Sequence, residues 1–370
     1  MRRWYGWIAG IVCAGIVQGC GGSTGETLPE EENNLSATAE PFFYQQWYVA
    51  CDETFCRENA IDPDAGIHMP LEALSSNGGK GVTVAVIDDG LDVSHPEIAS
   101  AIKATYNAAD GSTDVSYQTL SGYHGTAVTG LIASRINGKG ISGVAPRSDI
   151  VFLKYADEMS DSEAIAMFRK AEAMGADIIN CSWGTYHVSP AVKETIQDMS
   201  VNGRGGKGIV FVFAAGNDDT DMGEDESNIP EVIAVGASNA ENDRAWYSNH
   251  GENLDVLAPG GYRIGITTLD PVGIAGIAME NEDYLLATDP YGFIGTSASA
   301  PIVTGVIAQM LSVRPDLTRS EIESLLHRCA DKIGSMPYEE GFNPYYGYGK
   351  LNASCLLSSL ESESNNSGSY

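Results

Sequence analysis

The chain has 370 residues, of which 43% are hydrophobic. It is therefore long enough for one large domain of roughly 300 residues or for two smaller ones. Acidic residues outnumber basic ones by 50 to 21, and the formal net charge of −29 argues against nucleic acid and anionic lipid surfaces as electrostatic partners. This charge suits a soluble body at a cell surface, where it either attracts basic substrates or only maintains solubility.

The first residues have the features of a secretory signal. Two arginines at positions 2 and 3 precede an apolar stretch that is too short to be a stable membrane span. The sequence VQGC, which ends at Cys20, resembles a bacterial lipoprotein box. We therefore predict a lipoprotein signal peptide at residues 1–19 and a lipid on Cys20, which would anchor the protein outside the cytoplasm. Gly21 favours the outer membrane if the host has one, and ordinary cleavage with secretion is the alternative.

Residues 20–39 are predicted to form a flexible tether, because Gly, Ser, Thr, Glu and Asn predominate there. This segment is too short for a folded propeptide, so the chain either folds without one or uses a factor in trans. At the other end, residues 359–370 are rich in Ser, Glu and Asn and are predicted to be disordered. Residues 40–358 remain for the folded domain.

Within this domain, apolar strands alternate with helical patterns. The alternation predicts an α/β fold, in which helices cover both faces of a mostly parallel sheet. The apolar run at 302–313 is too short to cross a membrane and is predicted to be a core helix, whereas residues 265–291 are predicted to form a long hairpin. The expected strands are Val82–Asp88, Ile150–Lys154, Ile178–Ser182, Ile209–Ala214 and Val232–Ala237. The expected helices are Gly125–Ser134, Asp161–Met174, Pro190–Val201, Ser299–Val313 and Thr318–Cys329.

Three motifs place reactive side chains at the ends of these elements. Asp88 ends the first apolar strand, and His124 begins a helix of small residues. Ser297 lies in the sequence GTSASAP just before the core helix, where free backbone N–H groups and the helix dipole favour negative charge. Alone, a serine at this place is usually a cap. Together the three supply the nucleophile, the base and the orienting carboxylate of a serine hydrolase.

The order Asp, His, Ser and the residues around each motif resemble the subtilisin-like serine peptidases over most of the chain. The resemblance implies a three-layer sandwich and a serine endopeptidase that acts on polypeptides. In it, Ser297 attacks the carbonyl, His124 takes the proton and Asp88 holds the histidine tautomer. Asn217 would then donate to the oxyanion, although a turn residue is the simpler reading of this Asn by itself. A catalytically inactive peptide-binding relative and a surface scaffold are the alternatives.

Some motifs are closer to the kexin and furin branch of this family. The sequence QQWY at residues 45–48 is similar to the start of the catalytic domain in that branch, and residues 51–68 resemble an insertion relative to it. The segment after residue 358 is too short for the β-rich domain that usually follows. Enzymes of this branch cleave after basic residues. However, His187 and Ser121 stand where the branch has acidic residues, so preference for Arg or Lys is one of two open hypotheses.

The resemblance also implies a substrate cleft. One edge of the cleft would pair with an extended peptide as an added strand, and an acidic residue would lie near the pocket floor. A buried Trp is the alternative for Trp183, and a solvated surface or a cation site is the alternative for the acidic loop at 218–226. The implied substrate-binding residues are Asp89, Ser182, Trp183, Gly184, Ala214, Gly216 and Asp225.

Residues 135–143 have the length of the calcium loop of subtilisins. Ligation by oxygen alone suits Ca²⁺, so the resemblance implies one structural calcium ion, with an ordinary loop turn as the alternative. The implied ligands are the Asn137 amide oxygen, the carbonyls of Arg135, Lys139 and Ile141, and the carboxylates of Glu40 and Glu97.

Five cysteines follow the leader. In an oxidising compartment, Cys51 can pair with Cys56, and Cys329 can pair with Cys355. Cys181 lies in an apolar run and is predicted to be a buried free thiol.

Overall fold

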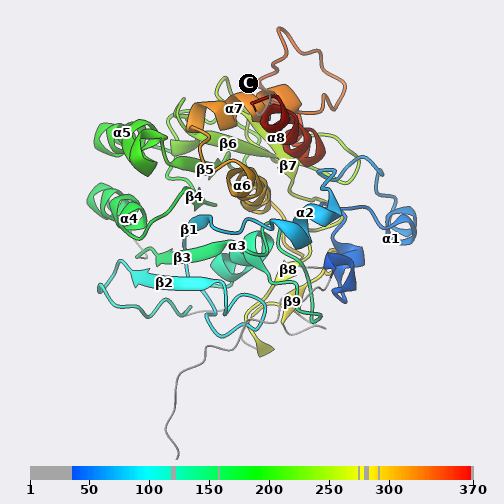
Figure 1. Ribbon diagram of the computed structural model, residues 1–370, viewed down its shortest axis with the longest axis horizontal. Helices are drawn as coiled ribbons and strands as arrows, with labels where there is room; N and C mark the ends of the chain where they lie inside the picture. Colours follow the sequence, from blue (N-terminus) through cyan, green and yellow to red (C-terminus); the bar gives the residue numbers. More distant parts are fainter. Residues whose placement is uncertain are drawn as a thin grey trace, which may run out of the picture. The chain divides into compact units, whose positions relative to one another are not determined.

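Seven parallel strands form the central sheet of the computed structural model, in the order β2-β3-β1-β4-β5-β6-β7 within the described residues (Figure 1). The structure describes residues 36–117, 122–156, 159–273, 276–278, 283–290 and 292–367. The predicted signal peptide, Cys20 and Ser121 lie outside these ranges. The strands are β1 (Thr83–Asp88), β2 (Ile102–Asn107), β3 (Asp149–Lys154), β4 (Ile178–Cys181), β5 (Val210–Ala214), β6 (Ile233–Ser238) and β7 (Val256–Pro259).

Helices cover both faces of this sheet, because each central strand is apolar on both sides. In β1, Val84 and Val86 pack on the side of α3 (His124–Ala133) and α6 (Thr296–Val313). Ala85 and Ile87 face the opposite side. There they meet the layer of α4 (Asp161–Ala173) and α5 (Pro190–Gly206), which Figure 1 shows across the sheet from α6. The predicted three-layer α/β fold is confirmed.

The expected elements are present with shifted ends. Capping boxes begin two helices: Ser160 with Glu163 begins α4, and Thr318 with Glu321 begins α7 (Arg319–Cys329). Helix α5 continues beyond Val201 to residue 206 across a kink at residues 203–205. Helix α6 is long and apolar enough to cross a membrane, but 83% of it is buried in the body, so it is the predicted core helix.

The predicted hairpin at 265–291 contains only short strands among its described residues. Strand β8 (Thr268–Leu269) pairs with β9 (Tyr284–Leu285) in antiparallel orientation. The hairpin rests on α3, since Thr268 Oγ1 donates a hydrogen bond of 2.6 Å to the Ala127 carbonyl. It therefore helps to fix the helix that carries His124.

At both ends, the folded part of the chain extends beyond the boundary that amino-acid composition predicts. Composition predicts a tether up to residue 39, whereas Ala37 in η1 (Ala37–Ala39) is already buried. It predicts a disordered tail from residue 359, whereas α8 (Ala353–Ser367) runs through most of it. Leu356 and Leu360 of this helix are buried in the core. The helix is therefore held by an apolar face, although most residues of its second half are polar. The remaining elements are η2 (Phe43–Gln45), α1 (Glu53–Glu58), α2 (Leu71–Ser76) and η3 (Glu226–Asn228).

Candidate active site

The carboxyl ends of three neighbouring strands supply the predicted site. Asp88 ends β1, Ser182 directly follows β4, and Asn217 lies just beyond β5. Helices α3 and α6, whose first turns hold His124 and Ser297, begin near this edge. Ligands of parallel α/β sheets bind at such an edge.

Asp88 and His124 form a direct pair. The distance from His124 Nδ1 to Asp88 Oδ1 is 2.8 Å, and the same oxygen accepts a bond of 2.8 Å from the Asp89 amide. Asp88 is fully buried, and its second oxygen has no partner among the described residues. Burial lowers the pKa of His124, but the charge and the hydrogen bond of Asp88 outweigh this effect, so the pKa lies above its usual value.

Ser297 contacts the edge of the cleft. Its Oγ donates a hydrogen bond of 3.0 Å to the Ser182 carbonyl, and Ser182 Oγ donates one of 3.1 Å back to the Ser297 carbonyl. In this conformation the hydroxyl hydrogen bond goes to Ser182 and not to His124. The structure thus places the nucleophile candidate beside the predicted substrate edge.

Asn217 is fixed by the start of α6. Its Oδ1 accepts hydrogen bonds from the Thr296 amide at 2.9 Å and from Thr296 Oγ1 at 3.1 Å. Both bonds involve Oδ1, so Nδ2 makes no hydrogen bond in the part of the chain that the structure describes. Gly295 has a φ of +133°, which side chains rarely adopt, and a Cβ there would lie 3.4 Å from the Asn217 amide.

A pocket of about 260 Å³ lies beside Ser297. Six of the seven predicted substrate-binding residues line it, and Asp89 does not. Tyr186 and Asn249 also line the pocket and were not predicted, because nothing in their local sequence distinguishes them from ordinary loop residues. Asp221, from the acidic loop at 218–226, lines it as well. The predicted residues that line it are Ser182, Trp183, Gly184, Ala214, Gly216 and Asp225.

Two carboxylates hold one wall of this pocket in place. Asp225 Oδ2 accepts a bond of 2.8 Å from the Tyr186 amide, while its Oδ1 accepts bonds from the amide and hydroxyl of Ser227. Glu226 accepts bonds of 3.0 and 2.7 Å from the amide and hydroxyl of Thr185. Burial raises the pKa of Glu226, against the effect of these bonds. A Cβ on Gly184 would overlap the Asp225 carboxylate, so the wall requires glycine there.

Trp183 packs inward. Its Nε1 donates a hydrogen bond of 2.8 Å to the Ile87 carbonyl, and its ring lies against Phe168 and Phe213. The alternative prediction, a buried Trp, therefore holds for the ring of Trp183. The residue nevertheless lines the pocket, as the first prediction says.

The predicted calcium loop folds around Glu40. The Glu40 carboxylate accepts four backbone hydrogen bonds of 2.6 to 3.1 Å, from residues 137–140. Since a carboxylate has about four acceptor sites, these bonds satisfy Glu40 without a metal ion, and its role as a calcium ligand stays a prediction. Through these bonds Glu40 shapes the loop.

Glu97 fits a cation better. It is fully buried, and its Oε2 has no partner within the described ranges. Burial, with the charge of Glu40, raises the pKa of Glu97 to about 7. The Tyr284 hydroxyl donates a hydrogen bond of 3.3 Å to the other oxygen, Oε1, and the loop residues Asn137 and Ile141 lie near enough to act on the pKa of this carboxyl. A divalent ion would satisfy the free oxygen and offset the repulsion between the two acids, so these residues fit Ca²⁺.

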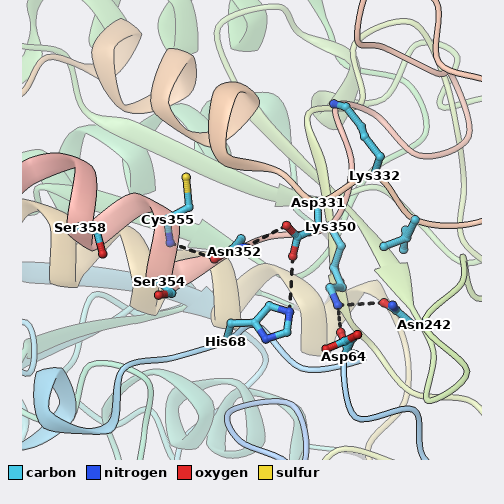
Figure 2. A pocket seen from close by; sticks show the side chains of 11 residues that line it. Asp64, His68, Asn242, Asp331, Lys332, Lys350, Asn352, Ser354, Cys355 and Ser358 are labelled. Carbon is cyan, nitrogen blue, oxygen red and sulfur yellow. Dashed lines mark hydrogen bonds and ion pairs between the residues drawn. The ribbon is translucent and has the colours of Figure 1, made fainter.

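A larger pocket, of about 800 Å³, shares no lining residue with the cleft (Figure 2). Lys350 is fully buried there and donates to the Asp64 carbonyl and to Asn242 Oδ1. Asp331 accepts a hydrogen bond of 2.9 Å from Asn352 and lies 3.5 Å from His68. These contacts tie segments from both ends of the chain together.

Both candidate disulfides are present in the structure, as Cys51–Cys56 and Cys329–Cys355. Cys181 is buried, as its apolar surroundings predict, and is unpaired among the described cysteines; burial raises the pKa of its thiol.

Known proteins share this architecture and sequence. The model of the Subtilase family matches residues 79–349. A calcium-dependent protease of Nostoc is 31% identical over 340 residues, which cover 84% of this chain and 50% of the relative. A subtilisin of Bacillus pumilus is 34% identical over 289 residues, covering 76% and 93%. The solved structure of a protease of Pseudoalteromonas arctica, 26% identical, matches with a TM-score of 0.69 over 87% of this chain and 99% of that one. The chain thus spans half the length of the Nostoc relative, and it belongs to the subtilase family of serine peptidases.

Proposed function

We propose that the chain is a serine endopeptidase that hydrolyses polypeptides through Asp88, His124 and Ser297. The observation that carries this proposal is the 2.8 Å hydrogen bond between the buried Asp88 and His124, at the sheet edge where Ser297 also lies. Bonding of Nδ1 to Asp88 leaves Nε2 of the neutral ring as the acceptor, which is the tautomer that a general base needs. The raised pKa of His124 favours the imidazolium ion that forms when the base takes the proton.

Catalysis then requires one exchange of hydrogen bonds. Ser297 Oγ leaves the Ser182 carbonyl, donates to His124 Nε2 and attacks the substrate carbonyl carbon. The proton passes to His124 and then to the leaving amine, and water cleaves the acyl-enzyme by the reverse path. Asn217 Nδ2 and the backbone N–H of Ser297 stabilise the oxyanion.

Labelling by a fluorophosphonate probe tests this proposal on the full chain. The wild type is expected to react, and the Ser297→Ala and His124→Ala variants are not. Ser299→Ala is the matched control, because Ser299 lies two residues further along the same helix and donates to the Ala258 carbonyl inside the core. A folded, calcium-loaded wild type that does not react would favour the inactive relative or the scaffold. Binding of unlabelled peptides would separate those two.

Specificity for basic residues is the second part of the proposal. Asp221 and Asp225 both line the pocket, and their charges favour Arg or Lys in it. Three donors already occupy Asp225, so about one acceptor site remains for a substrate. A peptide library should show Asp221→Asn lowering kcat/KM for Arg and Lys more than for Leu. Glu224→Gln, outside the pocket lining, is the control, and equal cleavage after Leu and Arg by the wild type would refute the preference.

A structural Ca²⁺ completes the domain. Glu97, the Asn137 amide oxygen and the carbonyls of Arg135, Lys139 and Ile141 would hold it. Support comes from the free buried oxygen of Glu97 and from the calcium-dependent protease of Nostoc to which the chain is similar. The ion would stabilise the loop, and no catalytic step requires it.

A lipid on Cys20 would anchor this enzyme outside the cytoplasm. The VQGC sequence supports the assignment. Metabolic labelling with a clickable palmitate analogue should mark the wild type and not Cys20→Ala, which should appear in the soluble fraction. An unlabelled wild type in the culture medium would favour ordinary secretion.

A further inference from the structure

Two adjacent carboxylates at the end of β1 hold two adjacent residues at the start of α3. Asp88 binds the His124 ring, as described above. Asp89 Oδ1 accepts a hydrogen bond of 3.0 Å from the backbone amide of Gly125. The side chain that was predicted to face a substrate subsite is therefore directed at the helix that carries the base.

This contact depends on how closely the two segments approach. A Cβ on Gly125 would collide with the Gly90 carbonyl and press on the Asp88 side chain. Glycine at 125 therefore lets the first turn of α3 lie directly on residues 88–90, within reach of Asp89. A carboxylate at this end of a helix also complements its dipole.

The Asp89 charge lies close to the base. Side-chain oxygens of Asp88 and Asp89 and a ring nitrogen of His124 all lie within 4.8 Å of one another. On another side the His124 ring meets the Phe293 ring, with 5.5 Å between the ring centres. Burial and the charges of Asp270 and Asp89 raise the pKa of Tyr123, the residue before His124. Asp88 and Asp89 both act to raise the pKa of His124, whereas burial lowers it.

We propose that Asp89 is a positioning residue for His124: its carboxylate fixes the start of α3 through Gly125, and its charge stabilises the protonated imidazole. This inference rests on the proposed function, in which His124 is the base. Burial and the charge of Asp88 raise the pKa of Asp89 itself to about 7, so about half of its charge is present at neutral pH and all of it only in alkaline solution.

Two variants of the full chain separate position from charge. Asp89→Asn keeps an oxygen for the Gly125 amide and removes the charge. Asp89→Ala removes both. Asp92→Asn is the control for loss of a nearby charge, since its carboxylate binds Ser94 and Val272 and makes no hydrogen bond to α3.

The first measurement is the NMR titration of the His124 ring, assigned with His124→Ala. Without the Asp89 charge the imidazolium is less stable, so its pKa should fall by about one unit in Asp89→Asn. Asp92→Asn should leave it within a few tenths of a unit. An unchanged His124 titration in Asp89→Asn would overturn the inference, and this readout does not depend on whether the protein is an active peptidase.

The second measurement is kcat/KM against pH for two peptides that differ only in the residue before the cleaved one, Lys or Ala. In Asp89→Asn the acidic limb should move to lower pH equally for both peptides. In Asp89→Ala, kcat should also fall at every pH, while its thermal unfolding shows that it is folded. A higher KM confined to the Lys peptide, with an unmoved pH profile, would instead assign Asp89 to the substrate subsite. A wild type without activity would refute the proposed function alone.

Discussion

Asn217 accepts a hydrogen bond of 2.9 Å from the backbone amide of Thr296, the residue immediately before Ser297. The first turn of α6 therefore fixes which end of the Asn217 amide faces the cleft. Oxygen and nitrogen of an amide have nearly the same shape, so only a donor such as this one selects the orientation. The result is an N–H donor beside the nucleophile candidate.

Asn217→Ala should lower kcat and leave KM nearly unchanged, because the donor acts on the charge that develops in the transition state. Loss of the corresponding amide in subtilisin itself costs about 10²- to 10³-fold in kcat, and we expect the same range here. Thr296→Ser, which keeps both donors to Asn217, should retain activity. Steady-state kinetics on a peptide substrate give both parameters, and a variant with unchanged kcat would exclude the oxyanion role.

Removal of calcium should lower the melting temperature, and added Ca²⁺ should restore it. Glu97→Gln should abolish this response, because it removes the buried charge that would bind the ion. Glu40→Gln is the informative comparison. It weakens the four-amide contact, so it should lower the melting temperature both with and without calcium. Differential scanning fluorimetry with EDTA measures both effects. A wild-type melting temperature that EDTA does not change would refute the calcium site.

Asp270, directly after β8, should make stability depend on pH. It is fully buried, with one oxygen bonded to the Ala278 amide and the other without a partner in the described segments. Burial raises its pKa to about 6. The folded state thus holds this proton more tightly than the unfolded state, so the free energy of unfolding should fall as pH rises from about 4 through 6.

Asp270→Asn should remove this decline. The difference in free energy of unfolding between the variant and the wild type should therefore shift in favour of the variant as the pH rises from 4 to above 6. Urea unfolding at several pH values measures the two curves. Parallel curves would show that Asp270 titrates alike in both states. Glu252→Gln, at an exposed site, should follow the wild type.

The Cys329–Cys355 disulfide should contribute more to stability than Cys51–Cys56. It closes a longer loop, with a sequence separation of 26 against 5. Loop entropy predicts losses of about 3.5 and about 2 kcal/mol for the two double Cys→Ser variants. Equilibrium denaturation in urea gives both values. A larger loss at Cys51–Cys56 would mean that strain or residual structure outweighs loop length.

Sequence patterns predict those helices and strands that can be identified from their own residues alone. Residues Val84–Ile87 are apolar because β1 is buried on both sides, so periodicity alone identifies the strand. The apolar pattern does not predict strand β2, because this strand lies at the edge of the sheet and its side chains are half-buried or exposed. Strand β7, also at an edge, has only four residues.

The same distinction applies to the site. Asp88, His124 and Ser297 each stand in a short motif that the local sequence reveals, and the three motifs together indicate a serine hydrolase. The local sequence does not reveal the roles of Glu226 and Glu40, because each depends on backbone amides brought from another segment. Asp89 is an intermediate case: its position was predicted, but its direction depends on how closely α3 approaches β1.

If Cys20 carries a lipid, burial of Ala37 limits how far the enzyme could act from a membrane. Only fifteen residues separate Cys20 from Ser36, where the described body begins. A chain of that length spans at most about 55 Å when fully extended. Its typical end-to-end distance, if it behaves as a random coil, is about 20–24 Å. With a lipid on Cys20, the cleft would therefore meet polypeptides held at the same membrane surface at a far higher local concentration than those free in solution.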